Sequence, residues 1–235
     1  RGAAVRVGAF ILDGDAPARL FDIAPHGKLA YAAVDEHGLL VLDVADPTRF
    51  ALVGEDAGHG EARRVALVGQ TAWVAADKGA VHIYDLRDPR RPIAFAQPRD
   101  EAAATDDQQA PGFAVADGRI AVSGRRLEAW DVSDPFVPRR LAVAPEGAAA
   151  RHAADAGDGV AWDGGRIVVA GGGDGTVKVV DASVSAKLGV SYSLPGCGEQ
   201  LWPVLYGAPD GKTLFSREER FDVAGGSDPR LVGRN

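Results

Sequence analysis

Two histidines and the only cysteine of this chain occur in short segments rich in glycine or alanine, together with acidic and amide side chains. The metal-binding candidates are His59, His152 and Cys197, and the ligand-binding candidates beside them are Glu61, Asp107, Gln108, Asp155 and Glu199. Imidazole, thiolate and carboxylate groups are the donors with which proteins bind Zn or Cu. The sequence has no His-x-His or Cys-x-x-Cys pair among them, so a shared site requires a fold that brings distant segments together.

The carboxylates alone allow a second chemistry. Glu61, Asp107, Asp155 and Glu199 could supply the acid and the base or nucleophile of a carbohydrate-active hydrolase. Against this interpretation, the segments around them are short and lack the aromatic residues expected for sugar stacking. We find no Ser-His-Asp signature and no nucleotide fingerprint. "GGGDGT" (171–176) joins two expected strands rather than a strand and a helix, which predicts a hairpin turn.

The elements that must position these residues come from an internal repeat. "LLVLDVADP" (39–47) recurs as "VHIYDLRDP" (81–89) and "LEAWDVSDP" (127–135), with degenerate copies at 177–185 and 219–229. The aspartates that end the apolar runs are Asp43, Asp85, Asp131, Asp181 and Asp222. They follow one another at intervals of about 40 to 50 residues, which is the length of a four-stranded propeller blade.

Each repeat contains four short runs rich in β-branched and aromatic residues, separated by turn signals such as "PHGK", "DGR" and "DKG". The sequence therefore predicts an all-β fold, a five-bladed β-propeller of four-stranded antiparallel blades in a single domain, 1–235. The expected blades are 18–57, 58–104, 105–147, 148–195 and 196–235. Residues 1–17 are expected to supply a ring-closing strand, a place for which "RLVG" near the C-terminus competes. If they belong to an upstream blade instead, the intact protein has more than five blades.

The repeated aspartates are interpreted as turn formers. Asp accepts hydrogen bonds from backbone N–H groups one or two residues further on, and Pro fixes φ for the turn into the last strand. Because one copy lies in each blade, Asp43, Asp85 and Asp131 cannot converge on one substrate. Residues from several blades converge only at the mouth of the central channel, beside the segments that precede each first strand. The candidates above lie in those segments.

Three interpretations of the mouth stay open: a metal or catalytic site, a water-filled inert channel, and a site for an organic ligand or peptide. We expect a non-catalytic scaffold that binds a protein partner or ligand through this face, without an obligatory cofactor. A metal-binding or redox protein that holds Zn or Cu is the alternative, followed by the hydrolase. His26, His37 and His82 are expected to be structural.

A basic patch is expected on the opposite face. "RDPRRP" (87–92) and "VPRRL" (137–141) place Arg87, Arg90, Arg91, Arg139 and Arg140 at turns of adjacent blades. Such a patch suits an acidic partner, and solvated turn arginines are the alternative.

The repeat resembles a known family. "AYAAVDEHGLLVLDVADPTRFALVG" (30–54) is similar to the LVIVD-repeat β-propellers of bacteria, and the segments 72–96 and 120–144 match the same pattern. The resemblance implies the fold and a periplasmic, extracellular or cell-surface location. It implies no catalytic activity, because no catalytic signature travels with the repeat.

Composition excludes several classes of function. The net charge of −7 and the pI of about 5.2 argue against nucleic-acid binding and against docking to an anionic membrane surface. No apolar run is long enough to span a membrane, and the single Cys197 permits no internal disulfide. The sequence begins with Arg rather than Met, so we expect a processed, trimmed or fragmentary chain.

Overall fold

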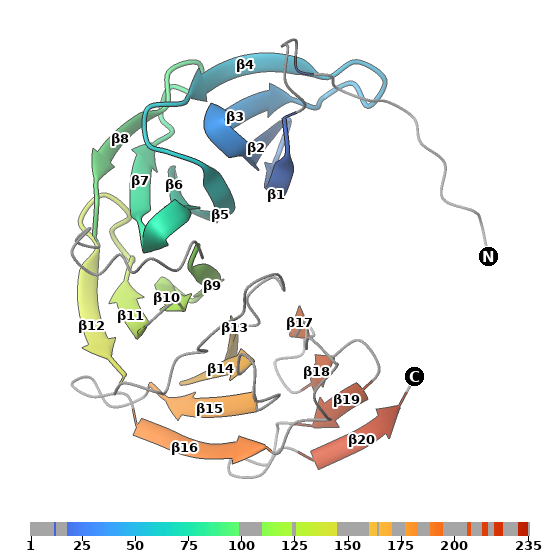
Figure 1. Cartoon of the computed structure of the whole chain (residues 1–235), viewed down its shortest axis with the longest axis vertical. Helices are drawn as coiled ribbons and strands as arrows, with labels where there is room; N and C mark the ends of the chain where they lie inside the picture. Colours follow the sequence, from blue (N-terminus) through green and yellow to red (C-terminus); the bar gives the residue numbers. More distant parts are fainter. Residues whose placement is uncertain are drawn as a thin grey trace. The chain divides into compact units, whose positions relative to one another are not determined.

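A computed structural model of the chain describes Leu12 and the ranges 18–98, 110–123, 126–144, 160–163, 165–170, 177–182, 189–194, 206–207, 213–215, 219–222 and 230–234. These residues form five four-stranded antiparallel sheets, each with its strands in chain order (Figure 1). The predicted all-β fold with four-stranded blades is confirmed. In the described part of the chain, no helix is long and apolar enough to cross a membrane.

The chain divides into two compact units, 1–110 and 111–235. The first unit holds two sheets, β1 (Leu20–His26), β2 (Leu29–Val34), β3 (Gly38–Asp43) and β4 (Ala51–Asp56), then β5 (Ala62–Val68), β6 (Thr71–Ala76), β7 (Val81–Asp85) and β8 (Ile93–Ala96). The short 3-10 turns η1 (Asp35–His37) and η2 (Asp77–Gly79) connect the second and third strands of these sheets. We refer to the two sheets as blades one and two.

The second unit holds three sheets. They comprise β9 (Gly112–Ala116), β10 (Arg119–Ser123), β11 (Leu127–Asp131) and β12 (Arg139–Val143), then β13 (Val160–Asp163), β14 (Arg166–Ala170), β15 (Val177–Asp181) and β16 (Gly189–Leu194), then β17 (Tyr206–Gly207), β18 (Thr213–Phe215), β19 (Glu219–Asp222) and β20 (Arg230–Arg234). The C-terminal "RLVG" thus lies in the fourth strand of the last sheet. The proposed ring-closing strand 1–17 lies outside the described residues except for Leu12, which packs against a cluster of buried residues in blade one.

The aspartates of the repeat are turn formers, as the sequence predicted. The Oδ1 atoms of Asp43, Asp85 and Asp131 each accept a hydrogen bond of 2.9 Å from the backbone N–H two residues further on. In these three motifs the aspartate before the proline does the same at 2.8–3.1 Å, and its carbonyl accepts the N–H three residues further on. Both carboxylates of these motifs therefore shape the backbone.

A β-bulge follows the same pattern in all five sheets. The pairing of the third strand with the fourth shifts by one residue just before the terminal aspartate, at Val41/Leu42 in the first sheet and Ile83/Tyr84 in the second. The shift recurs at the equivalent place in the other three sheets. Because a bulge bends the strand and increases its twist, the fourth strand of each sheet, which holds the extra residue, is bent at the same position.

Apolar residues on the facing sheets form the core within each unit. In the first unit, Tyr31, Leu39 and Val41 of blade one pack with Val74 and Tyr84 of blade two in one buried cluster. In the second unit, an equivalent cluster joins the sheet β9–β12 to the sheet β13–β16. A meander sheet with two apolar faces requires such a neighbour, so we expect the repeat to be stable only in series.

The Asp-Pro turn of blade two also contacts blade one. A Cβ atom added to Gly54 of β4 would lie 2.4 Å from the carbonyl oxygen of Pro89 and 2.8 Å from the backbone of Arg90. Only a residue without a side chain allows this close approach. The turn that the repeat builds is thus seated on the fourth strand of the preceding blade.

We predict that Gly54→Ala lowers the free energy of unfolding by about 1–3 kcal/mol, because the added methyl group must displace backbone atoms. Gly58→Ala is the matched control, since its nearest neighbour is the flexible Asp56 carboxylate at 3.1 Å. Urea denaturation of both variants measures the difference. Equal stability of the two variants would show that the contact at Gly54 is not close.

Candidate functional site

The first strands of blades one and two each carry a bulge, and the two bulged residues contact each other. The pairing of β1 with β2 skips Phe21, and the pairing of β5 with β6 skips Arg63. The Arg63 guanidinium carbon lies 4.1 Å from the centre of the Phe21 ring, within the range of a cation–π interaction. A bulge can redirect a side chain, and here it brings residues of two blades together.

Two carboxylates hold the same guanidinium group. Arg63 Nη2 lies 2.5 Å from Glu61 Oε2, and Arg63 Nε donates to Asp77 Oδ1 at 2.8 Å. The backbone N–H of Asp77 also donates to the Glu61 carbonyl at 3.1 Å, which fixes η2 beside the start of β5. The three side chains are partly buried, with 19–34% of their surface exposed. We call Asp35, Glu61, Arg63 and Asp77 the mouth cluster, after the predicted channel mouth to which the sequence analysis assigned Glu61.

Negative charge exceeds positive charge in the mouth cluster. The pKa of Glu61 is raised, mainly because its protonated carboxyl group can donate a hydrogen bond to Asp77, and further by burial and by the charges of Asp77 and Asp35. The pKa of Arg63 is raised by its hydrogen bond to Asp77. One guanidinium group therefore pairs with two carboxylates, and the charge of a third, Asp35, acts on both Glu61 and Arg63.

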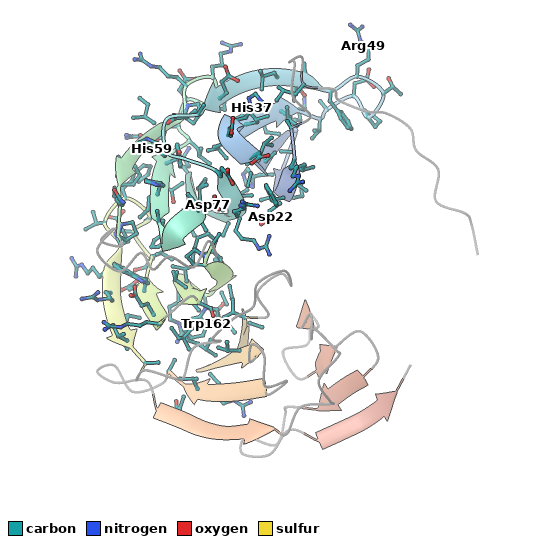
Figure 2. All side chains as sticks on the ribbon, viewed as in Figure 1. Asp22, His37, Arg49, His59, Asp77 and Trp162 are labelled. Carbon is teal, nitrogen blue, oxygen red and sulfur yellow. The ribbon has the colours of Figure 1, made fainter. Side chains whose placement is uncertain are left out.

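A second contact joins the same two strands. Asp22 Oδ1 accepts the N–H of Ile23 at 2.9 Å, while Asp22 Oδ2 accepts the N–H of Val65 in β5 at 3.0 Å. The single carboxylate thus links β1 to β5, and Figure 2 labels it together with Asp77. Because the donor is the backbone N–H of Val65, this hydrogen bond fixes the position of β5, the strand that carries Arg63.

His59 lies in the loop between β4 and β5 and contacts a buried histidine. Its ring stacks on that of His82 with centroids 4.7 Å apart, and it meets the Tyr84 ring edge-on at 5.9 Å. Its Nε2 atom is 3.7 Å from Asp56 Oδ2. Burial, and secondarily the charge of Asp56, raise the pKa of Tyr84. His59 therefore packs over the edge of the core between the two blades.

The other metal and ligand candidates cannot be placed. Asp107, Gln108, His152, Asp155, Cys197 and Glu199 lie outside the described residues. Within the part that is described, no three His, Cys, Asp or Glu residues are arranged to hold a metal ion. Of the predicted mouth residues, the structure brings Glu61 into the mouth cluster and places His59 in the loop that precedes it.

The arginines of the predicted basic patch occupy different elements. Arg87 is paired with Asp85 through Nη2 and Oδ2 at 2.5 Å, and Arg90 and Arg91 are exposed in the turn before β8. Arg139 and Arg140 were expected in a turn but are the first two residues of β12, where Arg140 lies 5.9 Å from the Trp130 ring. The two groups belong to different units.

Of the residues in this site, the sequence singled out only Glu61, and it missed Phe21, Asp22, Asp35, Arg63 and Asp77. Phe21 and Arg63 lie in ordinary first-strand runs, and a bulge has no sequence signature that would set them apart. Asp77 belongs to the "DKG" turn, where a turn former was expected. The equivalent place in blade one is Asp35, whose N–H donates to the Arg19 carbonyl at 3.1 Å. An aspartate thus begins the equivalent turn in both blades, and this repetition was the sequence signal that could have pointed to Asp35 and Asp77.

Comparison with known proteins identifies the repeat. The family model described as the LVIVD repeat matches residues 20–55, from the first residue of β1 to the residue before the end of β4. No curated protein matches the sequence. The resemblance to LVIVD-repeat propellers is confirmed.

Solved structures with the same fold are β-propellers of low sequence identity. Sqt1 of Chaetomium thermophilum, solved bound to the N-terminus of a ribosomal protein, has a TM-score of 0.65 at 17% identity, covering 91% of this chain and 61% of that one. The β-propeller domain of Cps50 (Swd1) from Myceliophteria thermophila has a TM-score of 0.62 at 15% identity, covering 93% and 70%. A proposed 6-phosphogluconolactonase from Bacteroides fragilis has a TM-score of 0.65 at 12% identity, covering 95% and 72%. This chain thus spans about three fifths of the length of Sqt1, and it is a β-propeller that carries an LVIVD repeat.

We predict that Arg63→Gln destabilises the protein by about 1 kcal/mol at pH 7, because the facing carboxylates lose the cation between them. The loss should shrink near pH 4, where protonation of Glu61, whose pKa is raised, relieves the repulsion. Urea denaturation at both pH values measures the change. Arg49→Gln, at an exposed turn, is the control and should have no effect at either pH; an equal loss at both pH values for Arg63→Gln would contradict the electrostatic explanation.

Proposed function

We propose that this chain is a non-catalytic scaffold that binds a partner protein through the face that carries the mouth cluster. The supporting observation is the excess of carboxylates around Arg63, held in fixed positions by η2, by the bulges of β1 and β5, and by Asp22. Groups that are fixed before binding lose little conformational entropy when a partner arrives. Partly exposed charges on a rigid frame suit recognition.

The excess of negative charge defines the kind of partner. A lysine, an arginine or an amino terminus of the partner would contact Glu61, Asp77 and Asp35. Its positive charge would lower the pKa of Glu61, which the negative charges of Asp77 and Asp35 raise. Sqt1 is a propeller bound to a protein N-terminus, which supports a comparable mode of binding here. We extend the proposal to a location outside the cytoplasm, as the resemblance to LVIVD-repeat propellers implies.

We predict that the double variant Glu61→Gln/Asp77→Asn loses partner binding by at least tenfold while it remains folded. The test is affinity capture from the native source with the immobilised protein, with quantitative mass spectrometry of the retained proteins. Both substitutions remove charge while keeping the size of the side chain. Circular dichroism of the variant checks the fold.

Glu55→Gln is the matched control, since it removes the same charge from an exposed position of β4. The proposal expects this variant to retain the same partner as the wild type. Equal capture by the double variant, or wild-type capture no greater than that of an unrelated propeller, would overturn it.

The metal-binding alternative rests on His59, His152 and Cys197, and of these the structure describes His59, which lies near His82 and Asp56. The scaffold proposal predicts far less than one Zn or Cu ion per chain in the purified protein. Elemental analysis of the wild type and of His59→Ala measures this directly. A stoichiometric metal that is lost in His59→Ala would favour the alternative.

A further inference from the structure

The fourth strand of blade two presents basic and apolar side chains together. Arg90 and Arg91 are exposed in the turn before β8, and Ile93 and Phe95 within β8 are 51% and 41% exposed. β8 is the last strand in the order of its sheet. We call these four residues the outer row. They lie on a different element from every member of the mouth cluster.

The turn beneath the two arginines is rigid. Asp88 Oδ1 accepts the N–H of Arg90 at 3.0 Å, and the Asp88 carbonyl accepts the N–H of Arg91 at 3.0 Å. The same turn is seated on Gly54 of blade one. The backbone that presents both guanidinium groups is therefore fixed before any partner binds.

The charges of these arginines are not used within the described structure. Arg87, three residues before Arg90, is paired with Asp85. In the described ranges, by contrast, neither Arg90 nor Arg91 forms an ion pair. Two adjacent cations thus remain available on a chain whose net charge is −7.

Blade one shows that the fold does not require these residue types. Its equivalent turn has Thr48 and Arg49, and its fourth strand has Ala51 and Val53 where blade two has Ile93 and Phe95. The turn hydrogen bonds and the bulge are the same in both blades. Arg90 and the larger apolar side chains of Ile93 and Phe95 are therefore not required by the repeat. They place an apolar surface next to a basic one.

We propose that the outer row is a docking site for an acidic segment of a partner protein that also carries apolar side chains. Its carboxylates would pair with Arg90 and Arg91, and its apolar groups would cover Ile93 and Phe95. Charge complementarity favours this occupant over a second copy of the acidic chain. Nucleic acid would use the arginines but would gain little from Ile93. This site is independent of the mouth cluster.

Selection from a random peptide library displayed on phage tests the proposal with the whole chain as target. Peptides selected on the wild type should be enriched in Asp and Glu next to apolar residues. Fluorescence anisotropy should then show that Arg90→Glu/Arg91→Glu weakens their binding by at least tenfold, and that Ile93→Ser weakens it by about threefold or more. The Glu61→Gln/Asp77→Asn variant should bind them as the wild type does.

Arg49→Glu is the matched control, because Arg49, labelled in Figure 2, occupies the turn position of blade one that Arg91 occupies in blade two. It should leave peptide binding unchanged. The proposal fails if the selected peptides are not acidic, if they bind Arg90→Glu/Arg91→Glu as tightly as the wild type, or if selection yields no binder. Single-stranded oligonucleotide that bound the same arginines more tightly than every selected peptide would also overturn it. Loss of peptide binding only in the mouth variant would move the site to the mouth cluster.

Discussion

The first three repeats depend on the hydrogen bond between the aspartate that ends the third strand and the backbone N–H two residues further on. This bond starts the turn in which the following Asp-Pro pair directs the chain into the fourth strand. In blade two, that turn is also seated on Gly54 of blade one. The same local interaction therefore builds a blade and joins it to the preceding one, so its aspartates are not available for chemistry.

Function is then expected where the structure departs from what the repeat requires. The packing of Tyr31, Leu39 and Tyr84 between blades one and two fixes the two first strands next to each other. On this frame, the bulges at Phe21 and Arg63 gather a guanidinium group and its carboxylates at one edge. Arg90, Ile93 and Phe95 differ from the equivalent residues of blade one, and they lie on another element. Both proposed binding surfaces present charges on a backbone fixed by hydrogen bonds, and the outer row adds apolar side chains.

The strands and turns could be predicted closely from the sequence, because they depend on local patterns that repeat. "LAYAAV" and "TAWVAA" coincide with β2 and β6, and the turn function of Asp43, Asp85 and Asp131 is as expected. The segments that precede the first strands directed attention to Glu61, which does lie in a charged cluster. Its partner Arg63 could not be identified, because a bulge depends on pairing between strands and leaves no pattern in one strand.

We propose that the repeated aspartates serve folding and that the mouth cluster serves binding. Measuring both the free energy of unfolding and the affinity for the captured partner, for the same set of variants, separates the two roles. We expect Asp85→Ala and Asp131→Ala to lose stability while the folded molecules bind with unchanged affinity. Asp77→Asn should show the opposite result, with little change in stability and weakened binding. Turn variants that keep their stability but lose binding would contradict the account.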